Sequence, residues 1–150
     1  MSGRILGLDP GERRIGVAVS DATGTIASPV EFIDRKTENV ELRLRDLCSE
    51  WEIAEIVVGL PVNLDGTEGP AAAKSREFGE FVKELTGLPV TLHDERFTTV
   101  TAEQALLEGG MHRGQRKEKR DQVAAAVMLH GFLDRRRHQL GDETDTRTGG

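Results

Sequence analysis

The 150-residue chain is poor in the residue types that several functional classes need. It has no tyrosine, one tryptophan and five phenylalanines, which leaves few aromatic side chains for stacking the bases of a single strand. Its one cysteine, Cys48, cannot form an internal disulfide and is expected to be a small buried side chain. No apolar run approaches the length of a membrane span, and the chain does not open on a basic segment followed by an apolar core. We therefore expect a cytoplasmic protein with no membrane partner.

The charge balance and the length narrow the remaining classes. The formal net charge is −6, whereas proteins that coat nucleic acids are usually basic. This balance disfavours a general coat protein, but it allows an enzyme whose acids gather at one site and whose bases line one groove. The length is that of one domain. We expect this domain to span residues 1–138, followed by a polar tail at 139–150 that is disordered.

Hydrophobic periodicity predicts three strands, followed by helices that alternate with two more strands. Strands are predicted at 5–8, 15–20, 25–33, 55–59 and 90–93. Helices are predicted to begin at Thr37 as the cap, at Pro70, at 98–101 and at 117–121. Three strands with short links form an antiparallel meander, and a strand reached through a helix pairs in parallel. This order predicts an α/β fold with one mixed sheet and helices on both faces.

Three acidic residues lie at the ends of predicted elements. Asp9 follows the first strand, Glu95 follows the fifth strand and Asp121 begins the last helix. The carboxyl ends of parallel strands share one edge of a sheet, and the small residues at 124–126 would let the last helix approach that sheet closely. Carboxylates that converge repel one another, and Mg²⁺ or Mn²⁺ is the hard cation that oxygen ligands suit. The pattern therefore predicts a metal site.

Each of these acids also has a simpler interpretation. Asp9 could be a turn-forming residue, and Glu95 could pair with Arg96 or Arg14. Asp121 is a common residue type near a helix start, where its charge suits the helix dipole. Taken singly, each acid is open to either interpretation.

A basic segment leads directly into Asp121. Between 112 and 120 there is one acid against five bases, which are Arg113, Arg116, Lys117, Lys119 and Arg120. This segment could be a solvated loop, but bases beside a metal site are what a polyanionic backbone needs. Together with the carboxylates it favours phosphodiester hydrolysis, in which two metal ions about 3.5–4 Å apart activate a water and stabilise the leaving 3′-oxygen.

Four motifs, in this order, resemble the YqgF family. They are LDPGERRIGVAVSD at 8–21, VVGLPVNLDGTEG at 57–69, DERFTT at 94–99 and RDQVAAAVMLHGFL at 120–133. The resemblance spans Arg4 to about Arg137. It implies a ribonuclease H-like fold, with a five-stranded sheet of order 3-2-1-4-5 in which strand two is antiparallel. It also implies a nuclease that matures the 5′ end of pre-16S ribosomal RNA or resolves Holliday junctions.

The resemblance also implies roles for individual residues. Catalytic and metal-binding roles fall on Asp9, Glu95 and Asp121, with two ions of Mg²⁺ or Mn²⁺. Supporting roles fall on Gly11 and Gly66, and substrate-binding roles on Arg14, Asn63, Asp65, Arg96 and Thr98. The arginines would orient the acids or hold phosphate, and the loop residues at 63 and 65 would lie over the substrate.

One position departs from the wider superfamily of junction resolvases. There, an acid usually ends strand four, whereas this chain has Gly59-Leu60-Pro61 at that point and carries its acid after strand five. The metal geometry is therefore not fixed by the resemblance.

Several functions and partners stay open at this point. The first hypothesis is a nuclease acting on precursor ribosomal RNA, with ribosomal particles as partners, and the second is a resolvase of branched DNA. A resolvase is expected to be a twofold dimer, so that paired cuts can be made, and the sequence allows a monomer or a homodimer. A binding protein without hydrolysis is disfavoured because all three acids are present. A sugar-kinase-type phosphotransferase is disfavoured because the chain holds one copy of the domain.

Overall fold

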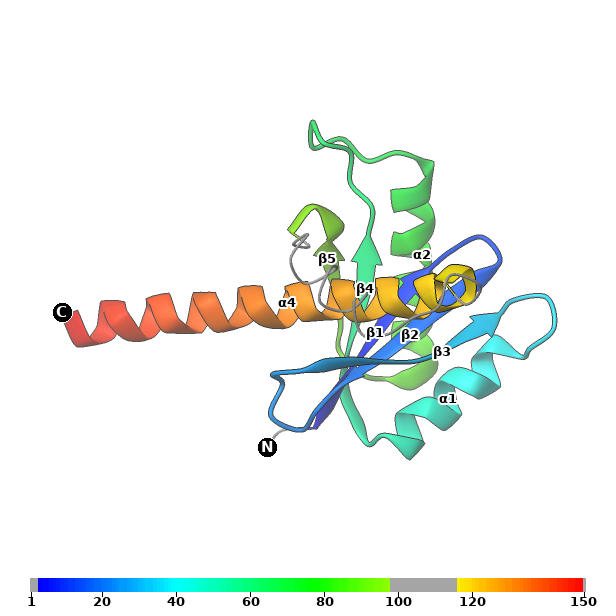
Figure 1. The fold of residues 1–150 in the computed structure, drawn as a ribbon, viewed down its shortest axis with the longest axis horizontal. Coiled ribbons are helices and arrows are strands. Elements are labelled where there is room, and N and C mark those ends of the chain that lie inside the picture. The colour runs from blue at the N-terminus through cyan, green and yellow to red at the C-terminus, as the bar shows by residue number, and fades with distance from the viewer. Residues whose placement is uncertain (1–2, 98–115, 150) are drawn as a thin grey trace.

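The computed structural model describes residues 3–97 and 116–149, with the backbone alone described at 97, 116–122 and 140–149. Five strands form one mixed sheet of order β3-β2-β1-β4-β5, shown in Figure 1. They are β1 (Arg4–Pro10), β2 (Arg14–Ser20), β3 (Ala27–Asp34), β4 (Ile53–Leu60) and β5 (Val90–Asp94). β2 is antiparallel to both of its neighbours, and β1, β4 and β5 run in parallel. The predicted strand order and the antiparallel second strand are confirmed.

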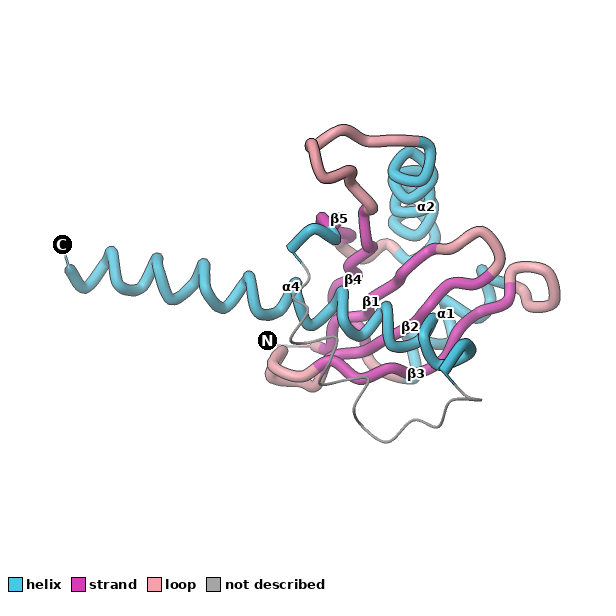
Figure 2. Tube along the Cα trace, turned by 45° about the horizontal axis from the view of Figure 1, so that its top comes forward, coloured by secondary structure: helices cyan, strands magenta, loops and turns pink. Residues whose placement is uncertain are grey.

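Helices cover both faces of this sheet, as Figure 2 shows. α1 (Val40–Glu50) and α2 (Pro70–Thr86) pack on one face, and α4 (Arg116–Gly149) crosses the other. A 3-10 turn, η1 (Glu95–Phe97), continues directly from β5. Among the described residues, no helix combines the length and the apolar character that crossing a membrane would need.

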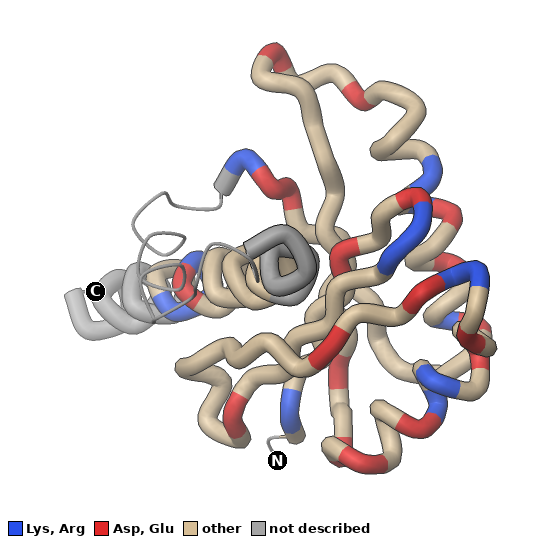
Figure 3. The backbone as a smooth tube through the Cα atoms, turned by 45° about the vertical axis from the view of Figure 1, so that its right-hand side comes forward, with Lys and Arg blue, Asp and Glu red and all other residues tan. Residues whose placement is uncertain are grey.

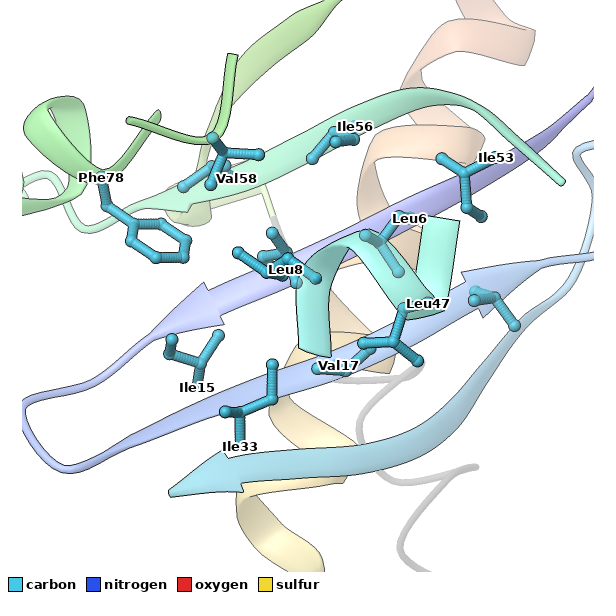
Figure 4. Close-up of a cluster of buried hydrophobic side chains, with 13 residues drawn as sticks. Leu6, Leu8, Ile15, Val17, Ile33, Leu47, Ile53, Ile56, Val58 and Phe78 are labelled. Carbon is cyan, nitrogen blue, oxygen red and sulfur yellow. The ribbon is translucent and has the colours of Figure 1, made fainter. Parts of the chain in front are cut away.

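The side chains of each strand alternate between the two faces. In β1, Leu6 and Leu8 are fully buried in the cluster under α1 and α2, drawn in Figure 4, whereas Ile5 belongs to the cluster under α4. Burying one such leucine contributes about 1.5–3 kcal/mol, so this alternation fixes the register of the strand. By the same alternation, Asp9 lies on the α4 face of β1.

α4 approaches the sheet closely because small residues lie at the contact. Ala125 and Ala126 are fully buried, and a Cβ added at Gly7 would lie 2.9 Å from Cβ of Leu129. The predicted close approach of the alanine-rich helix is therefore confirmed. It places the N-terminal half of α4 over the strands that carry the acids.

The start of α1 and the extent of β3 differ from the prediction. α1 is capped by Asn39, whose side chain accepts a hydrogen bond from the N–H of Leu42, and not by Thr37. The reason is a hydrogen-bonded turn before the helix that encloses Thr37. In it the N–H of Glu38 donates to the carbonyl of Asp34, and the N–H of Asp34 donates to the Glu38 carboxylate. β3 spans Ala27–Asp34 instead of 25–33, and it passes through Pro29, opposite which the register shifts between Val17 and Ala18. Such a bulge accommodates a residue that has no N–H to donate.

The end of the chain also differs from the prediction. α4 continues to Gly149, so the described backbone is helical over 139–149, within the 139–150 stretch where composition predicts a disordered tail. No proline follows Pro89, and one interior glycine such as Gly141 costs a helix only about 1 kcal/mol. The sequence therefore contains no strong stop signal after Arg137. The predicted domain boundary at 138 stays a prediction.

Candidate carboxylate site

The parallel strands bring two of the predicted acids to one edge of the sheet. Asp9 is the penultimate residue of β1, and Glu95 is the first residue after β5. β4 lies between these strands, so their backbones are about 10 Å apart. For the two carboxyl groups to meet, side chains must reach across β4.

Gly59 of β4 leaves the space in which the side chains of Asp9 and Glu95 can meet. It lies near the carboxyl end of β4, where it pairs with His93 of β5. A Cβ added at Gly59 would lie 2.6 Å from Oε1 of Glu95 and 3.3 Å from Cγ of Met128 in α4. The Glu95 carboxyl group therefore occupies the space that a side chain on β4 would fill. It lies on the α4 face, which is also the face of Asp9.

The electrostatics show that the two acids meet over Gly59. Burial, the charge of Asp9 and a hydrogen bond between the two carboxyl groups together raise the pKa of Glu95 to about 8, with a smaller contribution from Asp94. The raised pKa thus favours the protonated form of Glu95 over the charged form in the absence of a cation. Two oxygen-bearing acids that share a proton form a site whose charge a divalent cation could balance in its place. The donor set therefore fits Mg²⁺ or Mn²⁺.

This raised pKa predicts how stability depends on pH without metal. A carboxyl whose pKa is higher in the folded state stabilises the fold below its unfolded pKa, near 4.3, and that stabilisation is lost as the pH rises towards 8. We expect the melting temperature in EDTA to fall by roughly 3–6 °C between pH 6 and pH 9 because of this group. Thermal unfolding of the wild type and of Glu95→Gln measures the effect, because the uncharged amide should abolish most of the difference. An equal fall in both proteins would contradict this prediction.

The third acid, Asp121, cannot be placed to the same degree. It lies in α4, four residues before Ala125 and seven before Met128, spacings that put residues on one face of a helix. Its side chain lies outside the described part of the structure. Within the described residues, no group of three acids, histidines or cysteines that could hold a metal occurs. The convergence of Asp121 with Asp9 and Glu95 stays a prediction.

Arg96 contacts a different acid from the one that the simpler interpretation assigned. Its guanidinium bonds both oxygens of Asp94, at 2.7 Å from Nη2 and 3.0–3.1 Å from Nε, and its N–H also donates to Asp94. The stretch 94–96, two acids followed by a base, is the red-then-blue part of the tube after β5 in Figure 3, and Glu95 lies between the two members of the pair in sequence. Asp94 therefore positions Arg96, a role that sequence reasoning missed although the acid is part of the DERFTT motif. About a third of the Arg96 side chain is exposed, so its charge is accessible.

Arg14 borders the carboxylates from the other side. It begins β2, two residues before Gly16, which is the cross-strand partner of Asp9. Alternation places Arg14 on the α4 face, and its guanidinium lies 4.6 Å from the centre of the Phe32 ring. Its predicted part in orienting the acids or holding phosphate stays a prediction.

Asn63 and Asp65 hydrogen-bond within their own loop. The Asn63 amide donates to Oγ1 of Thr67, and the Asp65 carboxylate accepts from the N–H and the hydroxyl of Thr67. These bonds lower the pKa of Asp65. The two residues thus shape the loop between β4 and α2, and their contact with a substrate stays a prediction.

The remaining predicted substrate-binding residues fall where side chains are not described. Thr98 and Arg113 lie outside the described residues, as does the helix predicted to begin at 98–101. Arg116, Lys117 and Lys119 lie in the first turn of α4, where only the backbone is described.

The chain is similar over most of its length to proteins of one family. A family model described as "RuvX: Holliday junction resolvase" matches residues 3–135. A Desulfitobacterium hafniense protein named "Putative pre-16S rRNA nuclease" is 44% identical over 142 residues, covering 95% of this chain and 99% of its own. A protein of the same name from Rhodobacter capsulatus is 47% identical over 137 residues, covering 91% and 86%.

A solved structure extends the comparison to the fold. RuvC of Thermus thermophilus in complex with a Holliday junction substrate superimposes with a TM-score of 0.58 at 14% identity, covering 89% of this chain and 95% of its own. At that identity the likeness concerns the fold alone, and it confirms the predicted ribonuclease H-like fold together with the sheet order 3-2-1-4-5.

Proposed function

The chain belongs to the RuvX family, and on that premise we propose that it is a divalent-metal-dependent endonuclease that processes the 5′ end of pre-16S ribosomal RNA. The observation that carries the proposal is the hydrogen-bonded pair of Asp9 and Glu95 carboxyl groups above Gly59, at the carboxyl edge of the parallel strands. The names of the relatives supply the RNA substrate. A cytoplasmic location and association with ribosomal particles belong to the same proposal.

The proposed hydrolysis assigns metal-binding roles to the acidic residues and phosphate-binding roles to the basic ones. Asp9 and Glu95, with Asp121 from α4, would hold the metal, and two ions of Mg²⁺ or Mn²⁺ would supply activation of a water and stabilisation of the leaving 3′-oxygen. Arg14 and the Asp94-anchored Arg96 would bind phosphates on either side of these acids. The basic residues Arg113, Arg116, Lys117 and Lys119 and the hydroxyl of Thr98 would extend that contact along the substrate backbone.

Branched DNA is the second candidate substrate. The family description names a Holliday junction resolvase, and the RuvC structure holds a junction. Paired cuts across a junction call for a twofold dimer. The mass of the chain in solution therefore bears on this alternative, and a monomer would count against it.

The deciding experiment offers both substrates to the same preparation. A precursor RNA carrying the 5′ extension of 16S rRNA and a four-way DNA junction are incubated side by side with Mg²⁺, Mn²⁺ or EDTA. We expect cleavage of the RNA with either metal, none in EDTA, and no symmetrical cutting of the junction. Cutting of the junction alone would transfer the proposal to branched DNA. If neither the RNA nor the junction is cleaved with Mg²⁺ or Mn²⁺, the proposal is overturned.

A further inference from the structure

A groove of about 1210 Å³ lies one residue from Asp9, on the other face of the sheet. The turn after β1, one side of α2 and Arg35 just after β3 line it. Pro10 is among the lining residues, and alternation along β1 places its side chain on the face of α1 and α2, opposite to that of Asp9. Figure 1 shows the turn between β1 and β2 beside α2. The groove and the carboxylate pair therefore share the carboxyl edge of β1.

α2 begins in this groove without a side-chain cap. Its N-cap is Gly69, no side chain accepts a bond from its first turn, and that turn holds no acid. The first bond of the helix runs from the N–H of Ala73 to the carbonyl of Gly69, so the N–H groups of Ala71 and Ala72 point past the helix end. Ala71 lines the groove. N–H groups of this kind, together with the helix dipole, favour an anion at that end.

A buried hydroxyl group is an independent observation that points to a ligand. Ser75, one turn further along α2, is only 2% exposed and lines the same groove. Within the part of the chain whose side chains are described, this hydroxyl has no hydrogen-bond partner, although buried polar groups are normally bonded. An oxygen of a phosphate in the groove would accept the bond that Ser75 can donate.

The charges that line the groove suit one phosphate better than a long stretch of polyanion. Lys74 and Arg35 line it, but so do Glu12 and Glu77, and none of the four forms an ion pair with a described residue. The Arg35 guanidinium lies 5.4 Å from the centre of the Phe78 ring, which also lines the groove. The four side-chain charges balance, so the positive end of α2 decides the sign of the ligand. The two acids would repel further phosphates.

We propose that this groove binds one backbone phosphate of the strand that is cut, away from the bond over Asp9 and Glu95. The inference rests on the proposed function and adds a contact on the far face of the sheet. The groove exceeds the roughly 300–1,000 Å³ of most small-molecule sites, which favours a segment of polymer over a free anion. A strand held at both points must bend round the end of β1, and a duplex resists such bending. The substrate is therefore single-stranded beside the cut.

The test compares the two lysines of α2. Fluorescence anisotropy measures binding of a single-stranded RNA with the 5′ precursor sequence, over a range of salt concentrations, in the Glu95→Gln background with Mg²⁺. We expect Lys74→Gln to weaken binding roughly 10-fold and to reduce the slope of log K against log salt by about 0.7, the share of one phosphate. Ser75→Ala should weaken binding roughly 5-fold and leave the slope unchanged. A duplex of the same sequence should bind equally well to Lys74→Gln and to the protein that keeps Lys74.

Lys83→Gln is the matched control, because Lys83 is an exposed lysine in the last turn of the same helix. It removes the same charge and should change neither the affinity nor the slope. A neutral methylphosphonate, placed at each phosphate in turn, locates the contact. At one position away from the cut it should weaken binding to the protein with Lys74 but not to Lys74→Gln, because both changes remove the same contact.

Equal effects of Lys74→Gln and Lys83→Gln would overturn the groove site, as would the same dependence on Lys74 for the duplex. So would thermal stabilisation by millimolar inorganic phosphate that needs Lys74 while RNA binding does not, since the groove would then hold a free anion. A Lys74-dependent salt slope in a protein whose wild type cleaves nothing would support the groove and refute the nuclease. RNA cleavage by a wild type whose binding is unaffected by Lys74→Gln would refute the groove alone.

Discussion

Asp9→Asn and Glu95→Gln are each expected to reduce metal-dependent cleavage by roughly 1000-fold while the protein stays folded. Each change keeps the size of the side chain and replaces one of the two carboxyl groups that meet over Gly59. The amide presents only one oxygen to a cation and no negative charge. Single-turnover cleavage of the precursor RNA, measured over a range of Mg²⁺ and Mn²⁺ concentrations, gives the size of the loss.

The two variants should gain stability as they lose activity. Relieving the repulsion between the carboxylates should raise the free energy of unfolding in EDTA at pH 9 by about 0.5–2 kcal/mol. Asp134→Asn is the control, because Asp134 is a partly exposed acid of α4 paired with Arg137, and surface pairs of this kind contribute little. Cleavage by Glu95→Gln within threefold of wild type would remove Glu95 from the site.

Gly59→Ala is expected to reduce cleavage by roughly 100-fold, although Gly59 carries no functional group. Its new Cβ would lie 2.6 Å from Oε1 of Glu95, closer than van der Waals contact allows, so the carboxyl group must move away from Asp9. Displacing a reacting group by about 1 Å costs on the order of 100-fold in rate. The measurement is again single-turnover cleavage, together with the pH dependence of stability in EDTA, which should flatten because the carboxyl groups no longer meet.

Gly7→Ala is the matched control for this prediction. Gly7 lies on the same face of the neighbouring strand, and its added Cβ would lie 2.9 Å from Cβ of Leu129. That contact disturbs the packing of α4 but not the carboxyl pair, so the variant should lose about 1–3 kcal/mol of stability and keep its rate at temperatures where it is folded. Equal rate losses in both variants would show that Gly59 acts only through α4.

The sheet was predictable because its determinants are local. Alternating large residues in β2 and the continuous apolar runs of β1 and β4 identify strands, and the intervening helices fix which of them are parallel. The start of α1 was not predictable in the same way. Thr37 and Asn39 are both good caps, and the choice depends on the turn in which Asp34 and Glu38 bond each other. That turn exists only once β3 is in place.

In the site, too, some features were predictable from the sequence and others depend on the folded structure. The meeting of Asp9 and Glu95 follows from element order, since the ends of parallel strands share an edge. The Asp94–Arg96 pair and the role of Gly59 do not, because they depend on distances across strands that no sequence spacing encodes. A glycine at the end of a strand gives no hint by itself of what fills the space above it.

Gly59 and Glu95 also show that a carboxylate at one point of the site can come from either of two positions in the chain. An acidic side chain at position 59 would place its carboxylate near the point above β4 that the Glu95 carboxylate occupies. The two side chains could not both occupy that space. A protein with its acid at position 59 and a protein with its acid at position 95 would therefore place a carboxylate in the same region of the site. Aligning such proteins letter by letter would score both positions as mismatches, whereas superposing their oxygen atoms would reveal a shared site.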